Sequence, residues 1–218
     1  MDIFTTIIAF FQEGGVFMYP IVIVLALGMA ISIERFVYLS KISVTNRMVW
    51  KKITPYIRAG KFQDAVSVTS KSKSAIGQIL TYGLYRIKSA ARRDDIEKAM
   101  EESLMEVMPQ LEKRTHYLAT FANIATLLGL LGTIIGLINA FTAVAAANPA
   151  EKADLLSASI SVAMNTTAFG LMVAIPLLLV HTVLQSKTTS IVDSLEMVSV
   201  KFLNAVDERR TAADKAAG

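Results

Sequence analysis

Three long stretches of this chain contain no Asp, Glu, Lys or Arg, and they limit the possible folds more than any other feature. They cover residues 14–33, 115–150 and 155–186 of the 218. A helix rises about 1.5 Å per residue, so roughly 20 apolar residues cross the hydrocarbon core of a bilayer, which is about 30 Å thick. Each stretch is long enough to cross once. A mean hydropathy of +0.49 and a charged content of 18% also favour a membrane protein over a soluble one.

We therefore predict an all-α membrane protein with three transmembrane helices and long cytoplasmic helical extensions. Asn148-Pro149, followed by Glu151 and Lys152, marks a polar turn that makes the last two spans an αα-hairpin. The predicted segments are an interfacial helix at 1–13, transmembrane helices at 14–39, 116–145 and 157–185, a cytoplasmic helical domain at 40–115, a periplasmic turn at 146–156 and a cytoplasmic extension and tail at 186–218.

The basic residues are distributed asymmetrically. Of the 22, none lies in residues 1–34, sixteen lie between Arg35 and Arg114, and five lie from Lys187 onward. Positively charged loops stay in the cytoplasm, so we expect a periplasmic N-terminus and a cytoplasmic C-terminus. The net charge of +4 is thus explained by topology and by attraction to anionic lipid, and we expect no nucleic-acid partner.

The N-terminal residues have a helical pattern of apolar side chains that ends at Gly14-Gly15. This pattern predicts a short helix lying flat in the periplasmic interface of the membrane, and a disordered apolar terminus is the alternative. The apolar residues at helical spacing are Ile3, Phe4, Ile7, Ile8 and Phe11.

The polar region from residue 40 to residue 115 is predicted to form several short helices. The last of them has one apolar face, and Pro109 is expected to kink or interrupt it before the membrane. Its remaining positions carry mostly glutamates, a pattern typical of a solvated face. The apolar residues are Ile96, Met100, Leu104, Met108 and Leu111, and the charged ones are Glu97, Lys98, Glu101, Glu102, Glu106 and Glu112.

Residue usage argues against most enzymatic chemistry. The chain has no cysteine and two histidines, which excludes disulfides and thiolate zinc sites and leaves little for an imidazole cluster. The sequence contains no phosphate-binding loop and no nucleophile elbow. We expect neither an enzyme nor a cofactor nor a bound metal.

Small and polar residues are concentrated in the second and third spans. Small residues four apart allow close helix packing, and polar groups inside a membrane are expected to point away from lipid. Helix association alone could explain these residues, or they could line a path for an ion. The packing candidates are Gly129, Gly132, Gly136, Gly170 and Pro176, and the ion-pathway candidates are Thr133, Thr167, Thr166, Asn165 and Asn139.

Apart from His116 and Tyr117 at the membrane boundary, these two spans contain no titratable group except His181. A chain that moves protons needs a group that binds and releases them, and hydroxyls and amides do not titrate near neutral pH. If protons pass here, a partner must supply the acid.

Three motifs in order resemble the MotA/TolQ/ExbB proton channel family. They are GVFMYPIVIVLALGMAISIER at residues 15–35, LLGLLGTIIGLINAF at 127–141 and TTAFGLMVAIP at 166–176. The three-span plan is closest to ExbB and TolQ, since MotA has four spans. By motif position, the pore threonines of the family fall on Thr133 and Thr167.

This resemblance implies a homopentameric ring in the bacterial inner membrane. A dimer of a single-span partner similar to ExbD or TolR would occupy the central pore and bring an aspartate. Ion flow would convert the proton or sodium motive force into mechanical work on periplasmic or outer-membrane components, with a TonB-like or other periplasmic transducer as a further partner. A non-conducting membrane scaffold is the alternative.

The chain departs from the family pattern at two places. Residues 160–164 read ISVAM where ExbB and TolQ usually carry a glutamate, and His181-Thr182 replaces a common Tyr-Asn pair. The Thr166-Thr167 pair also resembles sodium-driven relatives, because an additional hydroxyl could help to coordinate a hard cation. We favour protons.

Overall fold

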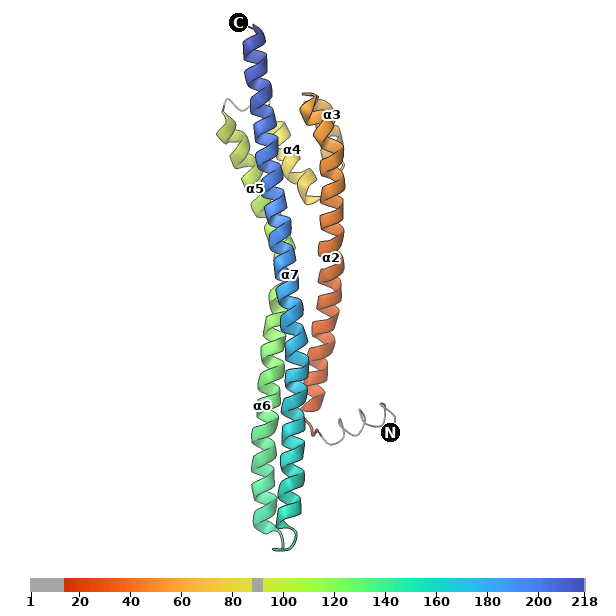
Figure 1. Ribbon diagram of the computed structural model, residues 1–218, viewed down its shortest axis with the longest axis vertical. Coiled ribbons are helices and arrows are strands. Elements are labelled where there is room, and N and C mark those ends of the chain that lie inside the picture. Colours follow the sequence, from red (N-terminus) through yellow and green to blue (C-terminus); the bar gives the residue numbers. More distant parts are fainter. Residues whose placement is uncertain (1–13, 88–91, 218) are drawn as a thin grey trace. The chain divides into compact units, whose positions relative to one another are not determined.

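The computed structural model describes residues 14–87 and 92–217 (Figure 1). The interfacial helix predicted for residues 1–13 lies outside the described residues and stays a prediction. The described elements are α2 (Met18–Arg58), α3 (Phe62–Thr69), α4 (Ala75–Ile87), α5 (Arg93–Glu112), α6 (Thr115–Ala146) and α7 (Lys152–Ala217). Within the described part of the chain every element is a helix, and three helical stretches are long and apolar enough to cross a membrane. The prediction of an all-α membrane protein with three spans is confirmed.

The chain divides into two compact units, and α2 and α7 each contribute to both. Unit 1 contains residues up to Arg35 and from Arg114 to Val183. Unit 2 contains Phe36 to Lys113 and Leu184 onward. The apolar stretches that could cross a membrane belong mainly to unit 1, and the predicted cytoplasmic helices belong to unit 2.

In unit 1, α6 and the first part of α7 lie side by side as an antiparallel hairpin (Figure 1). The turn between them is closed by the N–H of Glu151, which donates to the carbonyl of Asn148 at 3.0 Å. The start of α2 packs on the same hairpin, since a methyl group placed on Gly28 would lie 2.6 Å from a methyl carbon of Leu177.

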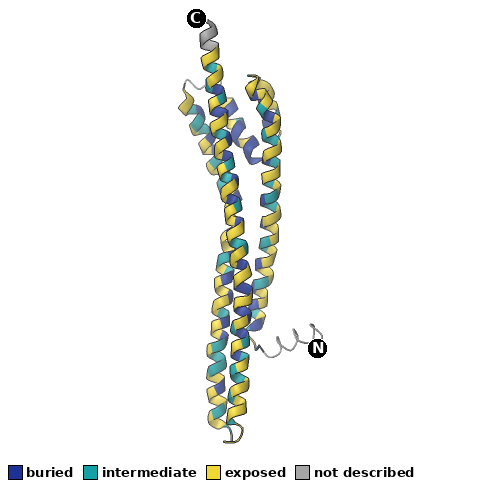
Figure 2. Ribbon diagram, in the orientation of Figure 1, coloured by how far each residue is buried: buried dark blue, intermediate teal, exposed yellow. Residues whose placement is uncertain are grey.

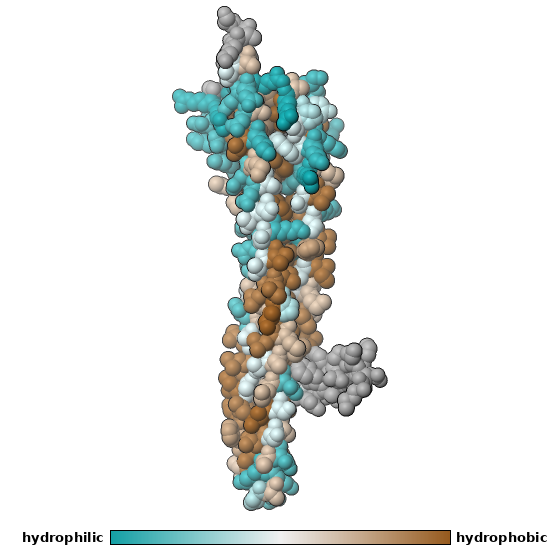
Figure 3. All heavy atoms as spheres, in the orientation of Figure 1, coloured by the Kyte–Doolittle hydropathy of each residue, from teal (hydrophilic) through white to brown (hydrophobic). Residues whose placement is uncertain are grey.

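Most of the apolar surface of these helices is exposed. Only 22–28% of the most apolar window of each candidate span is buried, and exposed and apolar side chains follow α6 and α7 along the hairpin (Figures 2 and 3). An isolated soluble protein rarely exposes such an area. This surface is suited to contact lipid or further protein.

The break between α5 and α6 does not fall at Pro109, which lies inside α5. The helix continues for three more residues, because the carbonyl of Pro109 still accepts a hydrogen bond from the N–H of Lys113 at 3.0 Å. The helix is interrupted at Arg114, whose φ of +65° is left-handed, and α6 begins at the next residue.

Unit 2 has an apolar core of its own, to which the described helices α2, α4, α5 and α7 contribute large side chains and α3 contributes Ala65. Of the predicted apolar face of α5, Ile96, Met100 and Leu111 are buried, and Leu104 and Met108 are half-buried. Buried side chains also come from α2 (Leu39, Ile53 and Ile57), α4 (Ile79, Leu80 and Leu84) and α7 (Ile191, Leu195, Val198, Phe202 and Val206).

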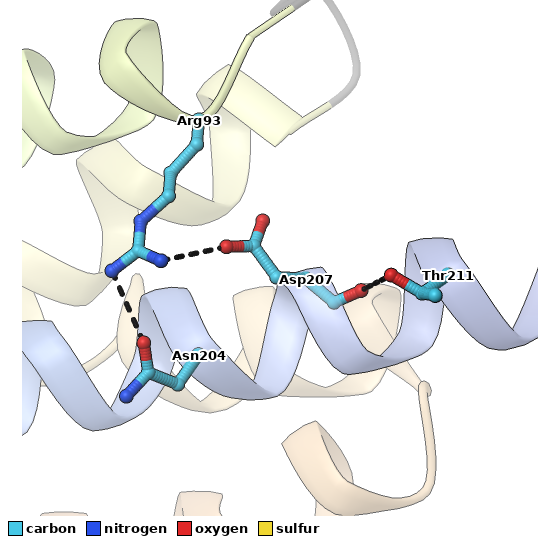
Figure 4. A network of polar contacts seen from close by, with 4 residues as sticks. All are labelled: Arg93, Asn204, Asp207 and Thr211. Atoms are coloured by element: carbon cyan, nitrogen blue, oxygen red, sulfur yellow. Dashed lines mark hydrogen bonds and ion pairs between the residues drawn. The ribbon is translucent and has the colours of Figure 1, made fainter.

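Polar contacts join the helices at the edge of this core. Arg93 at the start of α5 donates to Asp207 at 2.9 Å and to Asn204 at 3.1 Å, both on α7 (Figure 4). Asn46 of α2 accepts the N–H of Ile76 with its Oδ1 at 3.3 Å and so caps the first turn of α4.

Candidate ion-pathway site

The hydroxyls of Thr133 on α6 and Thr167 on α7 meet and hydrogen-bond to each other. Both also lie within hydrogen-bonding distance of one backbone oxygen, the carbonyl of Gly129. Thr167 Oγ1 donates to it at 2.9 Å and Thr133 Oγ1 at 3.2 Å. Both threonines are half-buried. Two residues 34 positions apart in sequence thus form one cluster of three oxygen atoms.

Glycines bring the two helices close enough for this contact. A methyl group on Gly170 would lie 2.6 Å from the carbonyl oxygen of Ala125, and one on Gly129 would lie 3.2 Å from the Cα of Thr167. Since real Cβ atoms do not approach a backbone this closely, any larger residue at Gly170 would push the helices apart. The crossing at Gly129 and Gly170 therefore sets the reach of the threonine pair.

The other packing glycines extend the same crossing toward the hairpin turn. A methyl group on Gly132 would lie 2.5 Å from the methyl carbon of Thr166, and one on Gly136 would lie 2.9 Å from the Cβ of Ala163. Pro176, the remaining packing candidate, is exposed and lies inside α7.

Thr166 is buried, with 2% of its surface exposed, and its hydroxyl is engaged away from the threonine pair. It lies 2.5 Å from the carbonyl of Gly14, to which it donates, and 3.0 Å from that of Val162. Gly15 follows with a φ of +75°, a backbone conformation that favours glycine. Thr166 thus fixes the point at which the chain enters α2.

The two asparagine candidates lie apart from the pair. Asn139 is exposed on α6, six residues beyond Thr133 and so about 9 Å further along the helix. Asn165 is half-buried on α7, two residues before Thr167. A turn of 100° per residue places Asn165 on a different side of α7 from Thr167.

Charged groups in unit 1 lie at the end of the apolar stretch of α2. Glu34 forms an ion pair at 2.9 Å with Arg114, the residue that precedes α6, and both side chains are nearly half exposed. Arg35 is buried, with 2% of its surface exposed. His181 is half-buried on α7, fourteen residues from Thr167. The threonine cluster itself has no charge of its own.

The hydrogen bonds of the pair determine what it can bind. Each hydroxyl has one proton and two lone pairs. In this cluster the two protons can be used by the Gly129 carbonyl and by the other threonine, which leaves lone pairs free. The pair therefore offers hydrogen-bond acceptors to a visiting group. In this arrangement a protonated acid or a cation fits the site, whereas an ionised carboxylate would find a donor only if one hydroxyl gave up its bond within the cluster.

No pattern in the sequence indicates the bond from Thr166 to Gly14, because these residues lie 152 positions apart. The Gly14-Gly15 pair signals a bend in the chain but not its partner. The role of the Gly129 carbonyl as a shared acceptor was also missed, since side-chain patterns do not reveal backbone acceptors.

Comparisons with known proteins agree with the three motifs. The sequence model of the MotA/TolQ/ExbB proton channel family matches residues 71–197, more than half of the chain. An ExbB homolog from Methanothermobacter thermautotrophicus is 28% identical over 203 residues, which cover 91% of this chain and 70% of the relative. The Tol-Pal system protein TolQ of Haemophilus influenzae is 32% identical over 94 residues, which cover 43% of this chain and 41% of that protein. Biopolymer transport protein exbB1 of Vibrio cholerae is 41% identical over 73 residues, covering 34% and 32%.

Proposed function

Because the chain belongs to the MotA/TolQ/ExbB proton channel family, we propose that it is the ring-forming subunit of an ion-driven motor in the bacterial inner membrane. The observation that carries this proposal is the Thr133–Thr167 pair, which lies between two helices that could cross a membrane and whose charge-free stretches contain no carboxylate. Several copies, five by resemblance, would surround a pore. In this arrangement the N-terminus is periplasmic and the C-terminus cytoplasmic.

The lack of an acidic residue in the charge-free stretches of α6 and α7 indicates that a partner protein supplies the proton-binding group. Residues 115–150 and 155–186 carry no Asp or Glu, so the proton-binding group must come from another chain. A dimer of a single-span protein similar to ExbD or TolR, with an aspartate in its membrane helix, would supply it. The exposed apolar surface of α6 and α7 supports a role in contacting such a helix.

The acceptor character of the pair suggests how protonation becomes movement. A protonated aspartate can donate a hydrogen bond to Thr133 or Thr167, whereas an ionised one has no proton to donate and would face lone pairs. Gain and loss of the proton would therefore switch the partner between bound and unbound positions at each subunit. One charge moving through 100 mV releases about 2.3 kcal/mol, which is comparable with the hydrogen bonds that must be exchanged.

The same geometry favours protons over sodium. A sodium ion would need to replace most of its water shell by several oxygen atoms, and one subunit offers three at the pair. The hydroxyl of Thr166, which could have added a fourth, is bonded to Gly14 at 2.5 Å. A proton carried by the partner acid needs only one acceptor. We therefore propose protons as the coupling ion.

The test is proton entry into cells that produce this chain together with its single-span partner, measured with a pH-sensitive fluorescent protein. We expect entry to require both proteins and to stop when the partner aspartate is changed to asparagine. A scaffold that does not conduct would give no entry in any combination, and would keep its periplasmic role after an uncoupler collapses the gradient. Either result would overturn the proposal.

A further inference from the structure

The part of α2 in unit 2 presents an exposed basic face. Between Phe36 and Arg58 the helix has five basic residues and no acidic one. Three of them are exposed next to two apolar side chains, Val44 at 58% and Met48 at 52% exposure. At 100° per residue these positions share one side of the helix. We define the basic face as Val44, Arg47, Met48, Lys51 and Lys52.

Attraction to anionic lipid, expected for the basic residues next to the membrane spans, does not extend over this face. Lys51 lies eighteen residues beyond Ile33, where the charge-free stretch ends, and so about 27 Å further along the continuous α2 helix. Charges are screened over about 8 Å at physiological ionic strength. The basic face therefore needs another anionic partner if its charge is to be used.

Helix α5 presents the complementary surface. It carries seven acidic and two basic residues. Its exposed side has Met105 at its centre, 66% exposed, with Glu101, Glu102 and Glu106 around it and Lys98 beside them. These five residues line one shallow depression. We define the acidic face as Glu101, Glu102, Met105 and Glu106.

We propose that the acidic face of one copy of this chain docks on the basic face of the next copy. Each face has exposed methionine at its centre and charged residues around it, all basic on one face and three glutamates with Lys98 beside them on the other, which is the usual layout of a protein interface with an apolar centre and a polar rim. The charges are opposite, and the faces lie on different helices. A contact between two different faces repeats from copy to copy and closes into a ring when the rotation permits. The proposal rests on the proposed function only in requiring several copies, and it assigns the surface that joins them.

Cysteine cross-linking tests this contact without background, because the chain has no cysteine of its own. The variants are Met48→Cys, Met105→Cys and the double variant, each made in the full chain in membranes without any ion gradient. After oxidation, we expect covalent multimers larger than dimers from the double variant. Two differently tagged single variants produced together should give the mixed dimer only. Cross-linking of either single variant to itself, or no mixed dimer while the oligomer persists, would overturn the proposal.

Charge reversal tests the electrostatic part. Lys51→Glu with Lys52→Glu, or Glu101→Lys with Glu102→Lys, should lower the yield of the mixed dimer about tenfold, and combining the two reversals should restore it. Lys71→Glu with Lys73→Glu is the matched control, because both lysines are exposed in unit 2 outside either face. An equal effect of the control, or no rescue by the combination, would contradict the pairing. Failure here with intact proton entry would refute the interface alone, whereas loss of proton entry with intact cross-links would refute the proposed function alone.

Discussion

Replacing Thr167 by valine removes one hydroxyl and little else. Valine has nearly the same shape, so the crossing of α6 and α7 at Gly129 should persist. The bond from Thr167 to the Gly129 carbonyl, 2.9 Å long, is lost together with the contact to Thr133. Thr133 still lies 3.2 Å from the same carbonyl and can satisfy it. No buried acceptor is left without a donor.

This substitution has two consequences. Loss of a neutral hydrogen bond whose acceptor keeps another donor costs about 0.5–1.5 kcal/mol of stability, so the protein should still fold and assemble. The partner acid also loses one of the two hydroxyls that can accept its proton. A hydrogen bond from a protonated, uncharged acid contributes about 0.5–1.5 kcal/mol, and each 1.4 kcal/mol is a factor of ten in rate. We expect proton entry to fall about 2- to 12-fold.

The assay is proton entry with the partner present, compared at equal amounts of assembled protein. Thr142→Val is the matched control: Thr142 is on the same helix as Thr133, is exposed, and bonds to the carbonyl one turn back at 2.9 Å. Thr167→Ser should retain most of the activity, because it keeps the hydroxyl. The reasoning is refuted if Thr167→Val and Thr142→Val lose entry equally, or if serine is as poor as valine.

Three further substitutions have expected outcomes that thermal unfolding of the purified protein can check. Thr166→Val leaves the carbonyl of Gly14 without its buried donor, so we expect it to cost about 1–3 kcal/mol and to destabilise more than Thr167→Val; an equal or smaller loss would contradict the anchoring role. Gly170→Ala places a methyl group 2.6 Å from a backbone carbonyl of α6 and should cost about 1–3 kcal/mol, and an unchanged midpoint would show that the helices separate freely. Asp207→Asn breaks an ion pair with Arg93 whose two side chains are 36% and 42% exposed, so the loss should stay below about 1 kcal/mol and shrink further in high salt; a larger loss would mean that the pair is not screened.

The three long helices could be predicted from the sequence because charged side chains are energetically costly over most of a membrane span. The charge-free stretch at 155–186 lies within α7, the one at 115–150 covers α6 and the residues that follow it, and the polar turn at Asn148 joins these helices. The position of the break before α6 could not be found in this way. Proline removes one donor and leaves its own carbonyl, which Lys113 still uses, so the helix ends three residues later than the proline rule suggests.

At the threonine cluster, the type of residue could be predicted from the sequence, but the direction in which each side chain points could not. Thr166 and Thr167 are adjacent and chemically identical, and a rotation of 100° separates their side chains on α7. One hydroxyl meets Thr133 and the other holds Gly14. The crossing of α7 with α6 determines which of the two hydroxyls meets Thr133 and which meets Gly14. The glycines of both helices set this crossing. A pattern within one helix contains no information on this contact.

From the sequence alone, close helix packing and an ion path are alternative explanations for the glycines and threonines of these two helices. At Gly129 they are the same explanation. Its missing side chain lets α7 approach to 3.2 Å, and its carbonyl then lies within reach of both hydroxyls. The bonds that hold the helices together use the hydroxyl protons, and for that reason the remaining lone pairs can only accept. The feature that makes the helices adhere therefore also makes the pair sensitive to whether a visiting acid carries its proton.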